Sequence, residues 1–186
     1  MAIDKVVSAS ITTDAVGPTQ LNEASNYAFT GTVTGAGGVN TPAFRAYIST
    51  NPVMSNNTLL KIAFDTEDFD TANAYDNSTN YRFTPQTAGK YFVSSTISIT
   101  NNVSANAGQY GKIYIYKNGS GLVSYIVDND NSYPHNQYSV TVNTLVSMNG
   151  SSDYLEIYGQ SAANSNSPQI GGGSNQSWFS AYKIIE

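Results

Sequence analysis

Four acidic side chains stand close together in this sequence, and they form its densest group of residues that could bind a metal ion. They are Asp65, Glu67, Asp68 and Asp70. A hard cation such as Ca²⁺ takes about six to eight oxygen ligands, often from closely spaced acids. The spacing is not that of an EF-hand loop, which also needs a glycine at its turn and a distal glutamate. We therefore expect a solvated acidic loop here rather than a metal site, and these carboxylates are the candidates if a cation binds.

Residues for nucleophilic or acid–base catalysis are scarce. His135 is the single histidine, and cysteine is absent. A Ser–His–Asp triad needs a base beside the nucleophile and a third group that orients the imidazole, and no Gly-x-Ser-x-Gly sequence occurs. Glu156 is the one glutamate on a predicted strand, where we expect it to face solvent and to favour solubility. The glycines at 171–173 precede Ser and Asn rather than the Lys-Ser/Thr pair of a phosphate loop. We therefore expect no enzymatic activity and no cofactor.

Carbohydrate recognition is the binding chemistry that the residue types leave open. Sugar-binding surfaces combine exposed aromatic rings with Asn and Asp side chains, and this sequence is rich in both. The loop between Val127 and Tyr138 contains Tyr133, His135 and Asn136, which are the candidates for contact with a ligand. An ordinary polar loop explains the same residues, and we favour that interpretation.

The charge of the chain argues against nucleic acid as a partner. Its net charge is −5, only 11% of its residues are charged, and Ser, Thr and Asn together make up one third of it. A protein that binds the phosphate backbone needs clustered Lys and Arg, whereas these residues are scattered from Lys5 to Lys183. Apolar runs are too short to span a membrane. The N-terminus lacks the basic start and apolar core of a secretory signal, so we expect a soluble protein that is not exported by one.

Short segments of alternating residues follow one another from Thr41 onward. Within 112–117, Ile113 and Ile115 fall on one face of a strand and Tyr114 and Tyr116 on the other. Turn-forming clusters such as 118–121 separate these segments. The pattern predicts an all-β domain, whether a sandwich, a jelly roll or a barrel. The clearest expected strands are Phe92–Ile99, Lys112–Lys117, Tyr138–Asn143, Tyr154–Tyr158 and Trp178–Ile185.

Residues 1–40 differ from the rest of the chain. They hold a single pair of aromatic residues, Tyr27 and Phe29, and end in a glycine-rich stretch at 35–38. Such a segment cannot bury a core of its own. We interpret it as an N-terminal arm that becomes ordered against a neighbouring subunit or a larger surface, followed by a head domain over residues 41–186. A flexible leader is the alternative.

Short motifs in the head occur in a recognisable order. They are Pro42–Tyr47, Ile62–Asp65, Tyr75–Pro85, Ala88–Phe92, Lys117–Gly119 and Ser177–Tyr182. In this order they resemble the jelly roll of the complement one-q globular head and the tumour necrosis factor superfamily, with Ala181 where that family usually has glycine. The resemblance runs from Pro42 to Ile185, about three quarters of the chain. It implies an antiparallel jelly-roll β-sandwich with an extended N-terminal arm.

The same resemblance implies a homotrimer. In that family the first and last strands lie near a threefold axis, which makes Phe44, Tyr47, Trp178, Phe179 and Tyr182 candidates for the trimer interface or the core beneath it. Fourteen tyrosines and seven phenylalanines exceed what one core of this size needs, and tyrosine suits interfaces. Strand alternation prevents Phe179 and Tyr182 from both pointing inward unless a bulge intervenes.

Two low-complexity segments, 7–16 and 29–35, resemble the leaders of tailed-phage structural proteins. Together the two resemblances imply a virion protein whose arm, residues 1–40, docks on the major capsid protein or another virion protein. Because 186 residues leave no room for a long fibre shaft, we expect a capsid decoration or cement protein on the capsid surface. The alternative is a tail-fibre protein or receptor-binding adhesin that recognises a host-surface glycan.

Overall fold

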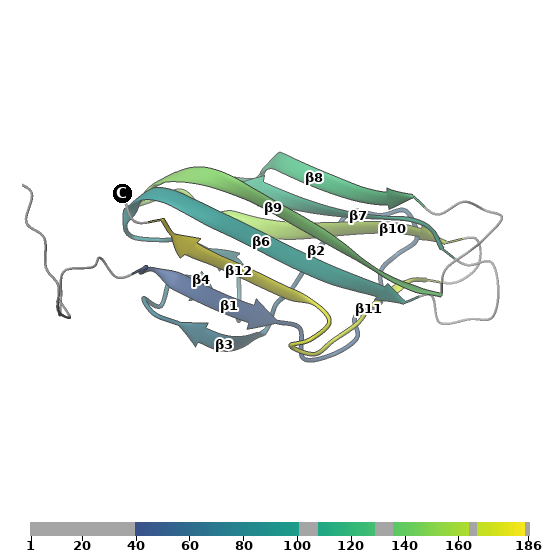
Figure 1. Ribbon diagram of the computed structural model, residues 1–186. Helices are drawn as coiled ribbons and strands as arrows, with labels where there is room; N and C mark the ends of the chain where they lie inside the picture. The colour runs from purple at the N-terminus through teal and green to yellow at the C-terminus, as the bar shows by residue number, and fades with distance from the viewer. Residues whose placement is uncertain (1–39, 101–107, 129–135, 164–166, 185–186) are drawn as a thin grey trace, which may run out of the picture. The chain divides into compact units, whose positions relative to one another are not determined.

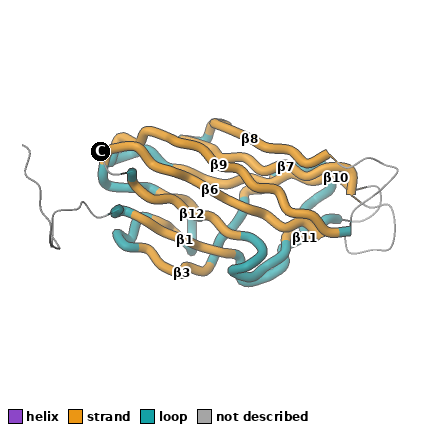
Figure 2. Tube along the Cα trace, in the orientation of Figure 1, coloured by secondary structure: helices purple, strands orange, loops and turns teal. Residues whose placement is uncertain are grey.

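The computed structural model describes residues 40–100, 108–128, 136–163 and 167–184. All regular secondary structure within these ranges is β-strand, and none of it is a helix that could cross a membrane. The strands are β1 (Ala43–Tyr47), β2 (Leu60–Lys61), β3 (Thr66–Asp70), β4 (Tyr75–Asp76), β5 (Arg82–Phe83), β6 (Ala88–Thr100), β7 (Gly108–Lys117), β8 (Ser120–Asp128), β9 (Gln137–Asn149), β10 (Leu155–Ala163), β11 (Gln169–Ile170) and β12 (Trp178–Lys183). Figure 2 shows how loops connect them at the two ends of the domain.

The strands form two antiparallel sheets that pack face to face (Figure 1). Sheet A has the order β11-β6-β12-β1-β3, and β9 pairs with the remaining edge of β6. Sheet B has the order β4-β5-β10-β7-β8, and β2 pairs with β10. The longest ladder joins β6 to β9, from the pair Ala88–Asn149 to the pair Thr100–Gln137. As a result β9 is an open edge of sheet A and β8 is an open edge of sheet B, and these two edges lie on the same side of the sandwich.

Local sequence accounts well for the hairpin between β7 and β8. Asn118 and Gly119 have φ values of 53° and 77°, the left-handed pair that a two-residue turn of type I′ requires. The Asn118 side chain accepts a hydrogen bond from the backbone N–H of Tyr154 at 2.9 Å and donates to Asp153 at 2.8 Å. The turn predicted at 118–121 is confirmed, and its asparagine also ties the hairpin to the start of β10.

Strand alternation places the predicted apolar face inside. Ile113 and Ile115 are fully buried between the sheets, whereas Tyr114 and Tyr116 lie on the outer face of sheet B. The all-β prediction is therefore confirmed, as are the individual strands expected in the second half of the chain. Strands β7, β9 and β10 extend further than expected, because the pairing of β9 with β6 and of β10 with β7 continues beyond the alternating residues. Strand β12, in contrast, ends at Lys183, short of the expected end at Ile185.

An aromatic cluster joins the two sheets. The Phe44 ring of sheet A stacks on Tyr75 and on Phe83 of sheet B, with centroids 4.6 Å apart in both pairs, and meets Phe179 edge-on at 4.9 Å. The Tyr75 hydroxyl donates a hydrogen bond to the carbonyl of Phe64 at 3.0 Å. Burial raises the pKa of Tyr75 well above its ordinary value. The cluster therefore holds its one hydroxyl neutral and satisfied within the core.

We predict that Phe44→Ala lowers the free energy of unfolding by about 3–5 kcal/mol, because it removes a fully buried ring from the centre of this cluster. Urea unfolding followed by tyrosine fluorescence measures the change. The matched control is Phe69→Ala on β3, whose side chain is 49% exposed. This control should cost little, and equal losses for the two variants would contradict the central role of the cluster.

Candidate functional site

The acidic segment is mainly an edge strand rather than the solvated loop expected from its composition. Thr66–Asp70 forms β3 and pairs with β1 at the edge of sheet A. Partial burial, and then the nearby charge of Asp70, raise the pKa of Glu67. The loop prediction is wrong because pairing with β1 outweighs the local preference of acidic residues for loops.

Three of the four carboxylates have partners within the protein. Asp65 accepts from the backbone N–H and hydroxyl of Ser49 at 2.8 and 2.7 Å, Asp68 pairs with the guanidinium of Arg45, and Asp70 accepts from the backbone N–H groups of Ala72 and Tyr75 at 3.0 and 2.8 Å. Each carboxylate thus fixes a different piece of local structure. In the part of the chain that the structure describes, no group of three or more acidic, histidine or cysteine side chains could hold a metal ion.

The residues expected to contact a ligand are only partly within the described ranges. Tyr133 and His135 lie outside them. Asn136 is exposed at the bend that precedes β9. A role for this loop in ligand binding therefore stays a prediction.

The five aromatic candidates for an interface or core divide between two faces. Phe44 and Phe179 are buried in the core between the sheets. Tyr47, Trp178 and Tyr182 lie on the outer face of sheet A, where Tyr182 is 41% exposed. No bulge interrupts β12, so Phe179 and Tyr182 point in opposite directions as alternation requires.

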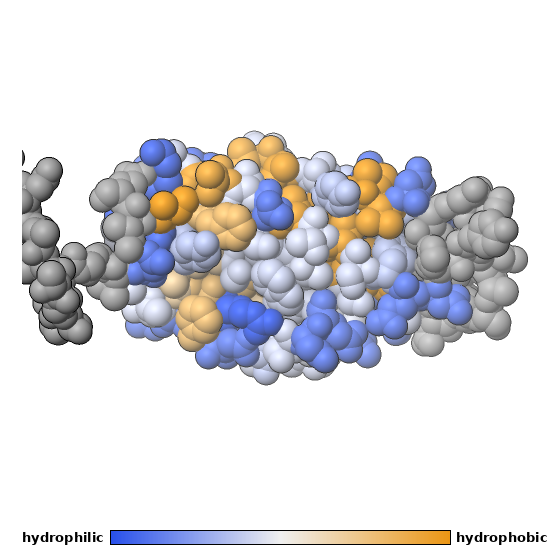
Figure 3. Space-filling view, in the orientation of Figure 1, coloured by the Kyte–Doolittle hydropathy of each residue, from blue (hydrophilic) through white to orange (hydrophobic). Residues whose placement is uncertain are grey.

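The outer face of sheet A carries little charge in its centre. Outward side chains on β9, β6, β12 and β1 form three cross-strand rows, which together we call the neutral face. The rows are Leu145, Phe92 and Tyr182, then Asn143, Ser94 and Ser180, and finally Thr141, Thr96, Trp178 and Tyr47. The rings of Phe92 and Tyr182 contact each other at 5.5 Å. Arg45 on β1 lies opposite Ser180 within this face, where Asp68 neutralises its charge and its guanidinium lies over the Trp178 ring. Near-white residues of intermediate hydropathy cover much of this face in Figure 3.

A second surface of exposed apolar side chains follows the open edge of sheet B. On β8, Leu122, Tyr125 and Ile126 are all more than two fifths exposed. A groove of about 530 Å³ separates this strand from β9, and Val123, Val127, Val140 and Val142 contribute to its lining. An open edge strand with exposed apolar residues is a surface at which another chain can pack. We call this surface the β8 edge.

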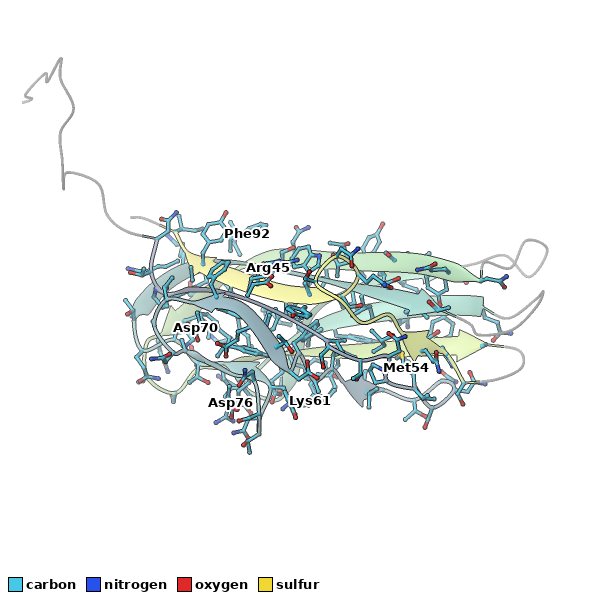
Figure 4. The ribbon with its side chains drawn as sticks, turned by 90° about the horizontal axis from the view of Figure 1, so that it is seen from below. Arg45, Met54, Lys61, Asp70, Asp76 and Phe92 are labelled. Carbon is cyan, nitrogen blue, oxygen red and sulfur yellow. The ribbon has the colours of Figure 1, made fainter. Side chains whose placement is uncertain are left out.

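The outer face of sheet B carries three tyrosines side by side, which we call the tyrosine face. Tyr116 lies between Tyr114 and Tyr158, with ring centroids 6.2 and 4.3 Å away. Figure 4 shows that Lys61, on this side of the sandwich, lies opposite Phe92 of sheet A. Burial, followed by the neighbouring Tyr116, raises the pKa of Tyr114. The pKa of Tyr158 is raised by burial and then by the charge of Glu156.

Glu156 is not the solvated residue expected from the sequence. It points to the outer face of sheet B, yet it is only 6% exposed. Its carboxylate accepts a hydrogen bond from the Lys61 ammonium at 2.5 Å. The prediction of a solvent-facing glutamate is wrong because the neighbouring side chains on this face cover it, which a strand pattern alone does not reveal.

Sequence patterns did not identify the three surfaces in full. Alternation placed Tyr114 and Tyr116 outside, but their contact with Tyr158 depends on the pairing of β7 with β10. Leu145 is 63% exposed at a position where alternation by itself predicts only an outward side chain. A leucine on the polar face of a strand was the one local signal that could have indicated an interface.

A comparison with protein-family models gives no match, and a comparison with curated proteins gives none either. Solved structures do match. Murine APRIL superposes with a TM-score of 0.56 and 8% identity, over 76% of this chain and 98% of that one. Eiger TNF from S. frugiperda gives a TM-score of 0.50 with 10% identity, over 78% of this chain and 94% of that one. PRD1 vertex protein P5 gives a TM-score of 0.52 with 16% identity, over 80% of this chain and 100% of that one.

These matches share their fold with this chain. The described head is a tumour necrosis factor-like jelly roll, as the order of motifs from Pro42 to Tyr182 implied. At identities of 8–16% the likeness concerns architecture alone. What the head does must therefore be argued from its surfaces.

We predict that chelation leaves the stability of the protein unchanged. The carboxylates at 65–70 accept hydrogen bonds from the protein itself, so EDTA should not shift the midpoint of thermal unfolding. Asp65→Ala, in contrast, should destabilise the head by about 1 kcal/mol, because Ser49 loses its acceptor. Calorimetry with EDTA and with added Ca²⁺ tests this. A fall of several degrees on chelation that Ca²⁺ reverses would restore the metal hypothesis.

Proposed function

We propose that this chain is a non-enzymatic structural protein of a phage virion, and that its head self-associates into a homotrimer that decorates the capsid surface. The observation that carries the proposal is the presence, on one jelly-roll head, of two different uncharged surfaces: the neutral face and the β8 edge. The fold shared with PRD1 vertex protein P5 supports the virion context.

The neutral face suits burial against another protein. Its outward residues include the large side chains Phe92, Leu145 and Tyr182, and small hydroxyl and amide groups separate these from Trp178 and Tyr47. Removing such a surface from water carries no cost for unpaired charge, and each buried apolar side chain contributes about 1.5–3 kcal/mol. The charged residue of this region, Arg45, is already paired with Asp68, so burial of the face would not leave the Arg45 charge without a partner.

Two different surfaces on one chain favour a ring. When the β8 edge of one copy packs on the neutral face of the next, the contact is heterologous, and such contacts close into a cycle if the rotation allows it. The resemblance noted in the sequence supports a rotation that closes after three copies, around the first and last strands. In sheet A these strands, β1 and β12, pair with each other on the side of the neutral face away from β9. Packing would also cover the exposed edge of β8, which otherwise risks aggregation.

The capsid location rests on the interpretation of residues 1–40 as an arm. In the proposal, residues 1–40 dock on the major capsid protein or another virion protein. A trimer would then bind through three arms at once, which raises its effective affinity without any new contact.

Self-association is tested by a charge in the neutral face. The full chain should form a species of three times 19.9 kDa in light scattering and sedimentation velocity. Leu145→Asp should raise the dissociation constant about tenfold or more, because it exchanges a buried leucine for a desolvated carboxylate.

The matched control for that experiment is Leu59→Asp. Leu59 precedes β2 in sheet B, is 41% exposed and lies outside both proposed contact surfaces. It should leave the trimer intact. A wild-type species of 19.9 kDa at micromolar concentration would refute the trimer.

Deletion of residues 1–40 tests the role of the arm. We expect the remaining head to fold and to form the same oligomer, since β1 begins at Ala43, but no longer to bind capsid particles. Co-sedimentation with particles that lack the protein measures the binding. Retention of full affinity by the truncated head would refute docking through the arm.

A further inference from the structure

A hollow of about 330 Å³ opens over the tyrosine face, at the point where β8 bulges away from β7. Its lining consists of Tyr114, Tyr116, Gly121, Leu122, Val123 and Ser124. The ladder shifts register between Ile115 and Tyr116, so that Gly121 comes to lie opposite Tyr116. A Cβ atom at Gly121 would lie 3.7 Å from the Tyr116 ring. The lack of a side chain there leaves this ring uncovered on the outer side.

The rings of the hollow are held in place by their neighbours. Tyr116 packs on Tyr158 with centroids 4.3 Å apart, and the Tyr114 hydroxyl donates to Gln160 Oε1 at 3.1 Å. The Gln160 amide in turn donates to Asn57 Oδ1 at 3.0 Å. A site whose side chains are fixed before binding loses little conformational entropy when a ligand arrives.

Polar groups surround the rings. Ser124 is exposed at the rim of the hollow. The ion pair of Glu156 and Lys61 adjoins Tyr158, and Glu156 is almost fully buried although it faces outward. The lining combines aromatic rings with a comparable share of polar surface, and the volume lies at the lower end of the range of small-ligand sites.

From this arrangement we propose that the tyrosine face binds a glycan through one of its pyranose rings. A pyranose has an apolar face of C–H groups and a rim of hydroxyls. The first matches the uncovered ring of Tyr116, and the second matches the hydroxyl, amide and carboxylate groups around it. The site is contained in one head, so it does not depend on the proposed trimer. Self-association through the β8 edge, which shares Leu122 with the hollow, would bring the next head to the rim of the site.

Other ligand classes fit this surface less well. Nucleic acid needs a cluster of free basic side chains, but Lys61 is paired with Glu156, and Lys112 lies over the Tyr110 ring. A stable protein interface buries about 800 Å² on each partner and is anchored by exposed large side chains. Within the hollow Leu122 is the one large apolar residue that is well exposed.

Screening of the full chain on an array of neutral and acidic pyranose oligosaccharides tests the proposal, followed by calorimetric titration with the best glycan. We expect a dissociation constant of about 0.1–1 mM for one site, equivalent to about −4 to −5.5 kcal/mol. Tyr116→Ala should weaken binding about tenfold or more by removing the stacking surface.

Because Tyr116→Ala also removes packing against Tyr158, a second variant keeps the test independent of folding. Gly121→Leu adds a side chain over the Tyr116 ring at an ordinary contact distance, so it should block the hollow without a loss of thermal stability. The matched control is Phe69→Ala on β3, which removes a 49% exposed aromatic ring outside the lining of the hollow and outside the proposed contact surfaces. It should change glycan binding less than twofold.

Three results would overturn the proposal. They are the absence of binding to any glycan on the array, glycan binding that survives Gly121→Leu, and a loss of binding in Phe69→Ala equal to that in Tyr116→Ala. If Gly121→Leu instead abolishes binding to another virion protein and no glycan binds, the tyrosine face is a protein interface. The oligomeric state of each variant, measured in the same samples, separates these outcomes from a failure of the trimer.

Discussion

The stack of Phe44 between Tyr75 and Phe83 is the contact on which the rest of this structure depends, because it fixes one sheet against the other. Phe179 meets Phe44 from the neighbouring strand of sheet A, so the first and last strands of the sandwich are held by the same cluster. Once these rings are buried, alternation along β1 and β12 directs Tyr47, Trp178 and Tyr182 to the outer face. The inner packing thus determines which side chains are offered for assembly.

The low charge of the chain has a structural counterpart in how its few charges are used. Arg45 pairs with Asp68, Lys61 with Glu156 and Lys117 with Asp153. Asp76 accepts hydrogen bonds from the backbone N–H groups of Ser78, Thr79 and Asn80, which hold its pKa well below the usual range. Charges therefore serve to fix turns and strand edges. Apart from the pairs of Arg45 with Asp68 and of Lys61 with Glu156, the outer faces described above consist mainly of hydroxyl, amide, aliphatic and aromatic groups, which can be buried against a partner at little desolvation cost.

The two sheets divide the outer surface into two sides of different character. On sheet A, aromatic side chains alternate with small residues over a broad face, as expected where one protein packs on another. On sheet B, Gly121 leaves a concave site over rings already fixed by Tyr158 and Gln160. The neutral face and the tyrosine face lie on opposite sides of the sandwich, whereas the β8 edge shares Leu122 with the hollow, so the proposed trimer contact would reach the rim of the glycan site.

Local sequence determined the elements of this protein, and the tertiary structure decided its sites. The alternation at 112–117, the Asn118–Gly119 turn and the order of motifs from Pro42 onward were enough to predict an all-β jelly roll, because side-chain period and turn geometry act over a few residues. Other features depend on partners far away in the chain. Glu156 is buried by Lys61, 95 positions distant, and residues 66–70 become a strand through β1. Cross-strand register, which no short segment encodes, sets these contacts, and it also brings Tyr116 against Tyr158 and opens the hollow beside Gly121.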